Sequence, residues 1–325
     1  MFPAPFNLAL ACLLDALFGD PQFRFHPVRL IGDVAETAKK FFFPWGRLGG
    51  LLTLFFTALV VVVAVGLSVQ KFPLLEPFFL YFFIAEKALR QEGLRVYQAL
   101  KEGDLGRARW LLSFIVGRET EDLSPSECIR AAVETISENF SDGFVGPLFY
   151  YFLGGIKACA LYKVVETLDS MYGYRVEPYR SFGYFPAKTD DFFNFFPARL
   201  AGLFLVLAAS LSGYQGRSAF ETMRRDAPRH DSPNAGWPEA AMAGALGIEL
   251  GGPLRYHGKR FEKARLGEPL RERQTEDIKR AVSLLRRAAF LWILSIFILE
   301  VVLWRSGYPH LISAIINGLK NAWTI

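Results

Sequence analysis

The sequence predicts an all-α, polytopic integral membrane protein, a single domain over residues 1–325 with about four or five membrane-embedded helices. Of its 325 residues, 52% are hydrophobic and 31 are phenylalanine, and the mean hydropathy is positive at +0.22. Soluble domains rarely carry so large an apolar fraction. Several uncharged runs are also long enough, or nearly so, to cross the roughly 30 Å hydrocarbon core of a bilayer as helices.

The clearest span is residues 48–70, which contain no charged residue and lie between Arg47 and Lys71. A helix of that length crosses the bilayer. Residues 72–85 follow as an apolar run that contains Glu76 and two prolines. We interpret this run as the return arm of a hairpin.

Three later runs are shorter or interrupted. Residues 200–216 are rich in small residues that suit helix packing in membranes, and residues 288–304 are broken by a single glutamate. Residues 144–162 are ambiguous, because Lys157 interrupts them and Gly154–Gly155 is a potential break.

The polar segments 86–142 and 217–287 are rich in Lys and Arg, which places both in the cytoplasm by the positive-inside rule. The apolar runs 143–162 and 200–216 then either both cross the membrane or are both re-entrant or interfacial. We favour the second alternative, because it lets the intervening segment 163–199 meet the other two at one cytoplasmic site.

Charge and cysteine usage exclude several classes. A net charge of +5 suits cytoplasmic loops or anionic substrates, and we find no nucleic-acid-binding motif. Cys12, Cys128 and Cys159 lack metal or redox spacing, so we expect reduced, buried thiols. The N-terminal stretch lacks the basic leader and cleavage site of a secretory signal. Standard nucleotide-binding and hydrolase motifs are also absent from the sequence.

The stretch LSPSECIRAAVETISENFSDG predicts a helix with a defined start and an acidic face. Ser124 is the expected N-cap, Pro125 the first helical residue, and Glu127 completes a capping box. At 100° per residue, Glu127, Glu134 and Glu138 lie within about 40° of one another. A solvated amphipathic helix is the ordinary explanation for such a face.

The end of this helix favours a ligand-binding role instead. We expect the helix to end near Gly143, which leaves Asp142 in the last turn, where a carboxylate opposes the helix dipole. Asn139 and Ser141 add oxygen atoms beside it. Such ligands suit magnesium, which takes one or two carboxylates and keeps waters for substrate phosphates.

A second polar cluster surrounds the adjacent acids Asp190 and Asp191, which lie among phenylalanines. Desolvation by such neighbours raises carboxylate pKa values or demands a cation. A membrane-interface belt explains the phenylalanines but not two adjacent acids, which favours a functional role. Other polar residues of this segment are Glu166, Asp169, Arg175, Lys188, Asn194 and Arg199.

A third cluster combines turn residues 231–236 with a helix predicted over residues 239–246 and opened by Pro238. The N–H groups at such a helix start can bind phosphate, although an ordinary cap is the alternative. His230 is either a general base or a hydrogen-bonding partner of its neighbours. The remaining residues of interest are Arg224, Arg225, Arg229, Ser232, Asn234 and Glu239.

A fourth stretch, residues 15–32, carries Asp20, His26 and Arg29 ahead of the first long helix. An interfacial anchor and a contribution to the site explain these residues equally well.

Together these stretches resemble the adenosylcobinamide-phosphate synthase family of cobalamin biosynthesis. The matching runs, in the family's order, are GDPQFRFHPVRLIG, GRETEDLSPSECIRAAVETISENFSDGFVGPLFY, TLDSMYGYR, TDDFFNFFPARL and RHDSPNAGWPEAAMAGALGIELGGPLRYHG. One departure is Glu166, where the family commonly has asparagine, so no role is carried over to this position.

The resemblance implies an enzyme that joins the carboxylate of adenosylcobyric acid to an amino-alcohol phosphate, usually aminopropanol phosphate, with ATP as the energy source. It implies a multi-pass protein of the cell (inner) membrane with cytoplasmic loops forming the active site, and a complex with other late cobalamin-assembly enzymes. The motif-bearing polar segments are 15–32, 86–142, 163–199 and 217–287.

Phosphoryl transfer onto a carboxylate needs magnesium, cations and alignment more than covalent help from the protein. We therefore expect the metal ligands to be Glu138, Asp142, Asp190 and Asp191. Glu134 or His230 would take the proton of the attacking ammonium, and Asp169 joins them as a catalytic residue. Substrate-binding residues would be His26, Arg29, Arg118, Asn139, Arg175, Lys188, Asn194, Arg199, Arg229, Ser232, Asn234 and Glu239.

Two other classes remain open: a membrane transporter, which requires ionisable groups buried within its spans, and a non-catalytic sensor, in which the motif acids would be lost.

Overall fold

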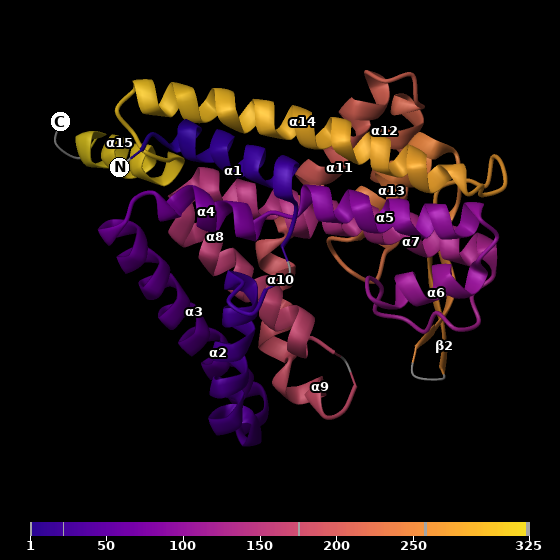
Figure 1. Cartoon of the computed structure of the whole chain (residues 1–325), viewed down its shortest axis with the longest axis horizontal. Helices are drawn as coiled ribbons and strands as arrows, with labels where there is room; N and C mark the ends of the chain where they lie inside the picture. The colour runs from indigo at the N-terminus through magenta and orange to yellow at the C-terminus, as the bar shows by residue number, and fades with distance from the viewer. Residues whose placement is uncertain (1, 22, 175, 257–258, 323–325) are drawn as a thin grey trace. The chain divides into compact units, whose positions relative to one another are not determined.

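The computed structural model describes residues 2–21, 23–174, 176–256 and 259–322. The chain forms two compact units, and each is assembled from separate stretches of sequence. The first unit consists of residues 1–85, 146–194 and 293–325, and the second of residues 86–145 and 195–292. Figure 1 shows their elements coloured along the chain.

All regular elements in the described part of the first unit are helices. They are α1 (Ala4–Phe18), α2 (Pro27–Phe42), η1 (Phe43–Trp45), α3 (Gly46–Lys71), α4 (Leu75–Phe83), α8 (Gly146–Tyr172), α9 (Tyr179–Phe182), α10 (Tyr184–Phe193), the C-terminal part of α14 (Glu276–Arg305) and α15 (Leu311–Ala322).

Three helical stretches are long and apolar enough to cross a membrane, namely Pro27–Lys71, Pro125–Tyr172 and Glu276–Arg305. A fourth candidate is the pair Tyr184–Phe193 and Phe195–Ser210, which is bent by 46° and forms either a broken span or a re-entrant loop. The predicted class, an all-α polytopic membrane protein, is confirmed.

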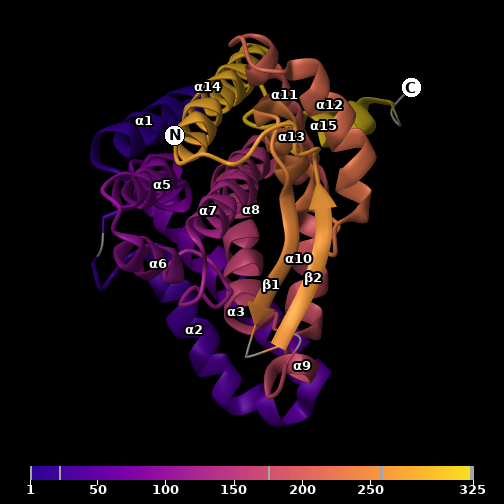
Figure 2. The same ribbon diagram turned by 90° about the vertical axis from the view of Figure 1, so that its right-hand side faces the viewer.

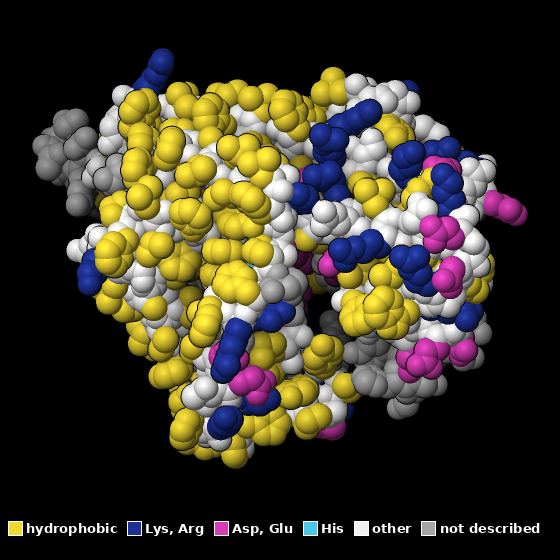
Figure 3. Space-filling view, viewed as in Figure 1, with side chains coloured by type: hydrophobic (Ala, Val, Ile, Leu, Met, Phe, Trp, Pro, Cys, Tyr) yellow, Lys and Arg dark blue, Asp and Glu magenta, His cyan; other side chains and the backbone are white. Residues whose placement is uncertain are grey.

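Helix α3 shows how the sequence separates protein-facing from lipid-facing residues. Phe55 and Leu67 are 66% and 61% exposed, whereas Gly50 and Thr53 are buried. Small residues at buried positions let membrane helices approach closely. Hydrophobic side chains gather around this helix in Figure 3, as a lipid-facing surface requires.

The second unit contains helices and one β-hairpin. Its elements are α5 (Glu86–Lys101), α6 (Leu105–Ser113), α7 (Pro125–Phe140), η2 (Ser141–Val145), α11 (Phe195–Ser210), α12 (Gly216–Asp226), η3 (Ala227–Arg229), α13 (Gly236–Leu246), β1 (Leu250–Tyr256), β2 (Lys259–Leu266) and the N-terminal part of α14.

The hairpin was not predicted from the sequence. Its strands pair antiparallel, with a register irregularity between Leu250 and Gly252, and Figure 2 shows them side by side. Gly251 and Gly252 both have positive φ values, of 77° and 83°, a backbone conformation that favours glycine. The glycine pair therefore permits the irregular start of the hairpin.

The predicted start of α7 is confirmed, but its predicted end is wrong. Ser124 and Glu127 form the capping box. After Phe140 the chain continues into the π-helix η2 instead of stopping near Gly143. Asp142 therefore lies in the first turn of a π-helix and not in the last turn of α7. Short π-helical segments occur frequently at functional sites.

Helix α8 has the break that the sequence suggested. Gly154 and Gly155 have non-helical backbone angles within it, and Gly155 has φ of 70°. A Cβ atom at Gly155 would lie 2.6 Å from Nε2 of His310. Glycine is required there both for the backbone angle and for this close approach.

The three cysteines are free thiols, as predicted. Cys128 and Cys159 are buried, but Cys12 is only half-buried.

Candidate functional site

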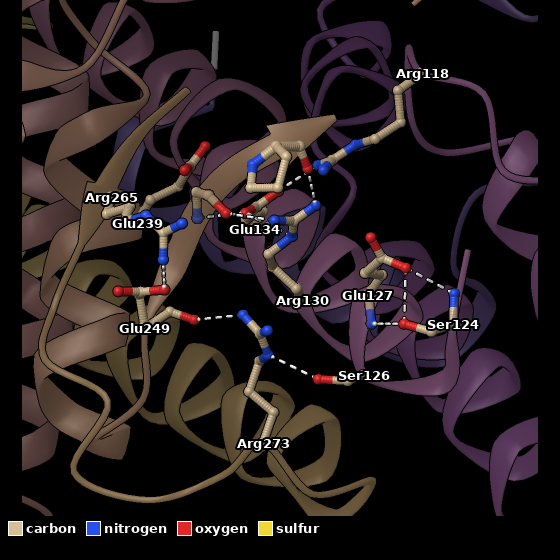
Figure 4. Close-up of polar contacts among 12 residues, drawn as sticks. Arg118, Ser124, Ser126, Glu127, Arg130, Glu134, Glu239, Glu249, Arg265 and Arg273 are labelled. Carbon is tan, nitrogen blue, oxygen red and sulfur yellow. Dashed lines mark hydrogen bonds and ion pairs between the residues drawn. The ribbon is translucent and has the colours of Figure 1, made fainter. Parts of the chain in front are cut away.

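A cluster of buried charged side chains lies in the second unit, where α7 packs against α13 and the hairpin. Glu134 of α7 is only 1% exposed, and its carboxylate pairs with the Arg118 guanidinium. Its other oxygen accepts a hydrogen bond of 2.7 Å from the Gly251 N–H and lies 3.8 Å from Arg130 Nε. Figure 4 shows both arginines turned toward Glu134. The carboxylate is therefore fully paired, as a buried charge requires.

A solvated acidic face, the ordinary explanation weighed for this helix, does not hold for Glu134, because the hairpin and Arg118 cover this part of α7. Glu127 does act as a cap, since its Oε2 accepts a 2.8 Å hydrogen bond from the Ser124 N–H. Glu138 is partly exposed.

Arg130 attaches the hairpin to α7. Its two terminal nitrogens donate hydrogen bonds of 2.5 and 2.6 Å to the carbonyl oxygens of Gly251 and Pro253. Arginine suits this role, because its planar fork presents several donors in a fixed geometry. The contact holds the hairpin strands, and with them Lys263, beside the carboxylates of α7 and α13.

Lys263 of β2 is the third cation of the cluster. Burial alone would lower its pKa, but the carboxylates of Glu239, Glu138 and Glu134 outweigh this effect and raise the pKa. Lys263 therefore stays charged and offsets part of the negative charge around it.

Glu239 of α13 and His230 face each other within the same cluster. Glu239 is fully buried, and neither carboxylate oxygen has a hydrogen-bond partner among the described residues. His230 Nε2 lies 3.7 Å from one of these oxygens, too far for a hydrogen bond. Burial raises the pKa of Glu239 well above its ordinary value, and the Lys263 charge offsets this only in part. Burial, together with Lys263, lowers the pKa of His230.

His230 Nδ1 contacts the Ser232 backbone in two ways. It lies 3.0 Å from the Ser232 nitrogen, from whose N–H it can accept, and 3.2 Å from the Ser232 carbonyl oxygen, to which it can donate. Both ring tautomers are compatible with these contacts. The sequence alternative of a hydrogen-bonding histidine is correct for Nδ1, while Nε2 faces Glu239 without a hydrogen-bond partner among the described residues.

The turn before α13 is largely satisfied internally. Ser232 Oγ accepts hydrogen bonds of 3.2 Å from the N–H groups of both Asn234 and Ala235, which leaves fewer donors for a phosphate than the sequence suggested. Arg229 pairs with Asp226 at 3.1 Å. Asp226 also pairs with Arg225 and accepts from the Gly267 N–H.

Glu138 and Asp142 lie four residues apart where α7 passes into η2. Both are partly exposed, as is Asn139 between them. Among the described residues, no group of three or more His, Cys, Asp or Glu side chains is placed to hold a metal. One or two carboxylates are nevertheless the usual protein contribution to a magnesium site, with waters and substrate phosphates supplying the rest. This pair fits that pattern.

In the first unit a second group forms around Asp190 of α10. Both Asp190 oxygens accept from the Asn194 side-chain amide at 3.0 Å, and the Asn194 carbonyl oxygen accepts from the Tyr162 hydroxyl at 2.7 Å. The charges of Asp169 and Glu166 act on Asp190. This concentration of acids also fits the carboxylate part of a magnesium site.

Other predicted residues of this segment have protein partners. Glu166, the departure from the family pattern, pairs with Lys163. Lys188 pairs with Asp191 at 2.8 Å. Arg175 lies outside the described residues.

Arg199, in the second unit, donates a hydrogen bond of 2.6 Å to the Phe195 carbonyl oxygen. Its guanidinium lies over the Phe195 and Trp237 rings, 3.6 and 4.5 Å from their centroids. Stacking of this kind uses the face of the guanidinium and leaves edge donors available.

The N-terminal residues have a structural explanation in the first unit. His26 caps α2, since Nδ1 accepts from the Val28 N–H at 3.3 Å, and Nε2 pairs with Asp20 at 2.9 Å. Arg29 is exposed. A role of His26 in substrate binding stays a prediction.

A profile of the CobD/Cbib protein family matches residues 8–285. The chain belongs to this family. Three relatives are named "Cobalamin biosynthesis protein CobD". That from Clostridium perfringens is 38% identical over 91% of this chain and 98% of its own length. The Geobacter metallireducens protein is 42% identical over 90% and 96%, and the Klebsiella pneumoniae protein is 40% identical over 87% and 93%. No solved structure matches the chain.

Membership of the CobD/Cbib family confirms the predicted resemblance and a role in cobalamin biosynthesis. The structure assembles Glu134, Glu138, His230 and Glu239 in one unit and Asp169, Asp190 and Asn194 in the other. A common pocket formed by the two groups stays a prediction.

Sequence reasoning missed two cations of the second unit, Arg130 and Lys263. Arg130 precedes Glu134 by four residues, a spacing that places both on one helix face. Lys263 lies in the run KRFEKARL, of which only the last four residues alternate between charged and apolar, a stretch at the short limit of a strand signal. The spacing of Arg130 and Glu134 was therefore the clearer of the two signals.

Proposed function

We propose that the protein is an adenosylcobinamide-phosphate synthase, which uses ATP to join adenosylcobyric acid to aminopropanol phosphate. The observation that carries this proposal is the buried cluster of the second unit. It combines paired charges with hydrogen-bonding groups that have no described partner, in a member of a cobalamin-biosynthesis family. Buried polar groups without partners are costly and require an explanation, such as a bound ligand.

The proposed reaction has two steps. The corrinoid carboxylate attacks the γ-phosphorus of ATP, which forms an acyl phosphate and releases ADP. The amine then attacks the acyl carbon, a C–N bond forms, the C–O bond to phosphate breaks, and phosphate leaves. Alignment and charge stabilisation account for most of the catalysis of such phosphoryl transfer.

Magnesium, when bound, would neutralise charge on the transferring phosphate. The carboxylates proposed to hold it, in some combination, are Glu138, Asp142, Asp190 and Asp191. The pairing of Asp191 with Lys188 makes it the weaker candidate of these four. We propose an inner-membrane location with the site facing the cytoplasm, as the Lys- and Arg-rich polar segments indicate.

Arg118, Lys188, Arg199 and Arg229 are the cations proposed for phosphate contacts. Arg199 suits this role, because its ring contacts leave edge donors free. Arg118, Arg229 and Lys188 are already paired with carboxylates, which makes them weaker candidates for a phosphate contact than Arg199.

The test is product formation by detergent-solubilised protein supplied with ATP, magnesium, cobyric acid and aminopropanol phosphate, followed by mass spectrometry. We expect the amide product together with ADP. Asp142→Asn and Asp190→Asn should each abolish turnover while expression and membrane insertion are retained. Asp33→Asn, an exposed aspartate of α2, is the matched control. Wild-type turnover in either site variant would refute the metal assignment.

A second candidate function, transport of a proton or small cation, is favoured by one observation in the first unit. Glu76 accepts a 3.0 Å hydrogen bond from the Tyr151 hydroxyl, and Glu300 lies 3.3 Å from His310 Nδ1. Both glutamates are buried, at 4% and 0% exposure. Ionisable groups within membrane helices frequently mark transport pathways. ADP release that depends on both the corrinoid and the amine would support the synthase over this alternative and over a non-catalytic sensor.

A further inference from the structure

Three neighbouring groups of the second unit have hydrogen-bonding capacity that the described residues do not use. Both oxygens of Glu239 and the Nε2 of His230 are buried without a hydrogen-bond partner. The Lys263 ammonium makes no hydrogen bond or ion pair within the described part of the chain, although its charge acts on both other groups. By contrast, Glu134 is occupied by Arg118 and Gly251.

The chemistry of the unused groups is of two opposite kinds. Glu239 presents two acceptors and Lys263 a cationic donor, while His230 Nε2 donates in the tautomer whose Nδ1 accepts from the Ser232 N–H. A ligand that satisfies all three must therefore carry a cationic donor and an anionic acceptor close together. ATP provides phosphate but no ammonium, and a simple amine provides no anion. A small primary amine that bears a phosphate provides both.

We propose that Glu239, Lys263 and His230 form the binding site of the amino-alcohol phosphate, with its ammonium on Glu239 and its phosphate on Lys263 and His230. This inference rests on the proposed function, because it names the groups that select its amine substrate. Lys263 is partly exposed whereas Glu239 is fully buried. The phosphate therefore lies at the outer end of the site and the amine at the inner end.

The experiment measures binding to the purified full-length chain in a detergent free of ethanolamine lipids. Isothermal titration compares 1-aminopropan-2-ol phosphate with propan-2-ol phosphate, which lacks the ammonium, and with 1-aminopropan-2-ol, which lacks the phosphate. We expect the complete ligand to bind at least about 30-fold more tightly than either half, since each half leaves either Glu239 or Lys263 without its partner.

Substitutions should separate the two ends of the ligand. Glu239→Gln should weaken binding of the complete ligand about 30-fold and leave the phosphate half unchanged. Lys263→Met should do the reverse, weakening the complete ligand and the phosphate half but not the amine half. Glu262→Gln, on the exposed side of the same strand, is the matched control. Wild-type affinity of Glu239→Gln, or equal loss of both halves in that variant, would overturn the assignment.

A second measurement uses the wild-type chain and does not depend on the folding of a variant. The complete ligand should slow acylation of Lys263 by an amine-reactive ester at least about 10-fold at saturation, while the exposed Lys101 reacts unchanged. Ligand binding without protection of Lys263 would overturn the proposal. Phosphatidylethanolamine headgroups share the ligand's chemistry. Protection by vesicles of that lipid, without protection by the soluble ligand, would identify a lipid occupant and overturn the substrate assignment.

The turnover assay distinguishes failure of the proposed amine site from failure of the proposed synthase function. Amide formation with an unchanged KM for the amine in both variants would refute this site and leave the proposed function intact. Selective binding without any amide product would leave the site intact and refute the proposed function.

Discussion

Replacement of Arg118 by leucine tests whether the pairing of Glu134 maintains the second unit. Loss of one partner from a buried ion pair costs about 3–5 kcal/mol. Glu134 would retain the Gly251 N–H at 2.7 Å and Arg130 at 3.8 Å, so we expect the lower end, about 3 kcal/mol. At roughly 2 °C per kcal/mol for a large chain, the apparent Tm in detergent should fall by about 6 °C. Tryptophan fluorescence during a thermal ramp measures this shift.

Two comparisons make this measurement decisive. The double variant Arg118→Leu with Glu134→Leu should recover at least half of the loss, because it no longer buries an unpaired charge. Arg107→Leu breaks an exposed pair with Glu102, in which the side chains are 53% and 46% exposed, and should shift the free energy of unfolding by less than about 1 kcal/mol. Equal effects of the buried and exposed substitutions, or a double variant less stable than Arg118→Leu, would refute the reasoning.

Two further predictions concern the packing of Gly50 and the protonation of His230. Gly50→Ala places a Cβ 1.8 Å from the Phe182 carbonyl oxygen and should destabilise the first unit by about 1–3 kcal/mol. Gly117→Ala, whose Cβ meets nothing within 4 Å, should be neutral in the same Tm assay. The folded-state pKa of His230 is lowered. Below about pH 6.5, His230 therefore binds a proton in the unfolded chain but not in the folded chain. The free energy of unfolding should fall as the pH falls from there. His230→Gln should flatten the plot of Tm against pH between about pH 7 and pH 5, and an unchanged slope would contradict this.

Apolar length predicted α3 and a local capping rule predicted the start of α7 correctly, because both signals act within one segment. Residues 48–70 correspond to α3 (Gly46–Lys71), and the cap at Ser124 starts α7 as expected. The end of α7 was wrong for a physical reason: a π-helical turn keeps the backbone hydrogen-bonded through Gly143, so no helix terminus forms.

The candidate site shows a different limit. Glu134 and Glu239 were identified as polar residues of motifs, but the sequence does not show which of the two is paired with a cationic side chain of the protein. Arg118 and the Gly251 N–H reach Glu134 from segments distant in sequence, and the hairpin that carries Lys263 was not predicted at all. Residue types near one another in sequence can be read directly. Pairing across the fold depends on packing that no local pattern contains.

The contrast between Glu134 and Glu239 also separates stability from binding within one cluster. A paired buried carboxylate contributes to stability only while its partner is present, so its loss should appear in the Tm. An unpaired buried carboxyl costs desolvation free energy, and the raised pKa of Glu239 means that it is protonated more readily than an ordinary glutamate. Glutamine has nearly the shape of a protonated carboxyl group. Glu239→Gln should therefore leave the Tm unchanged or higher while it removes the negative charge that a cationic ligand needs. A fall in Tm as large as that of Arg118→Leu would show that Glu239 stabilises the fold as Glu134 does and is not a ligand-binding group.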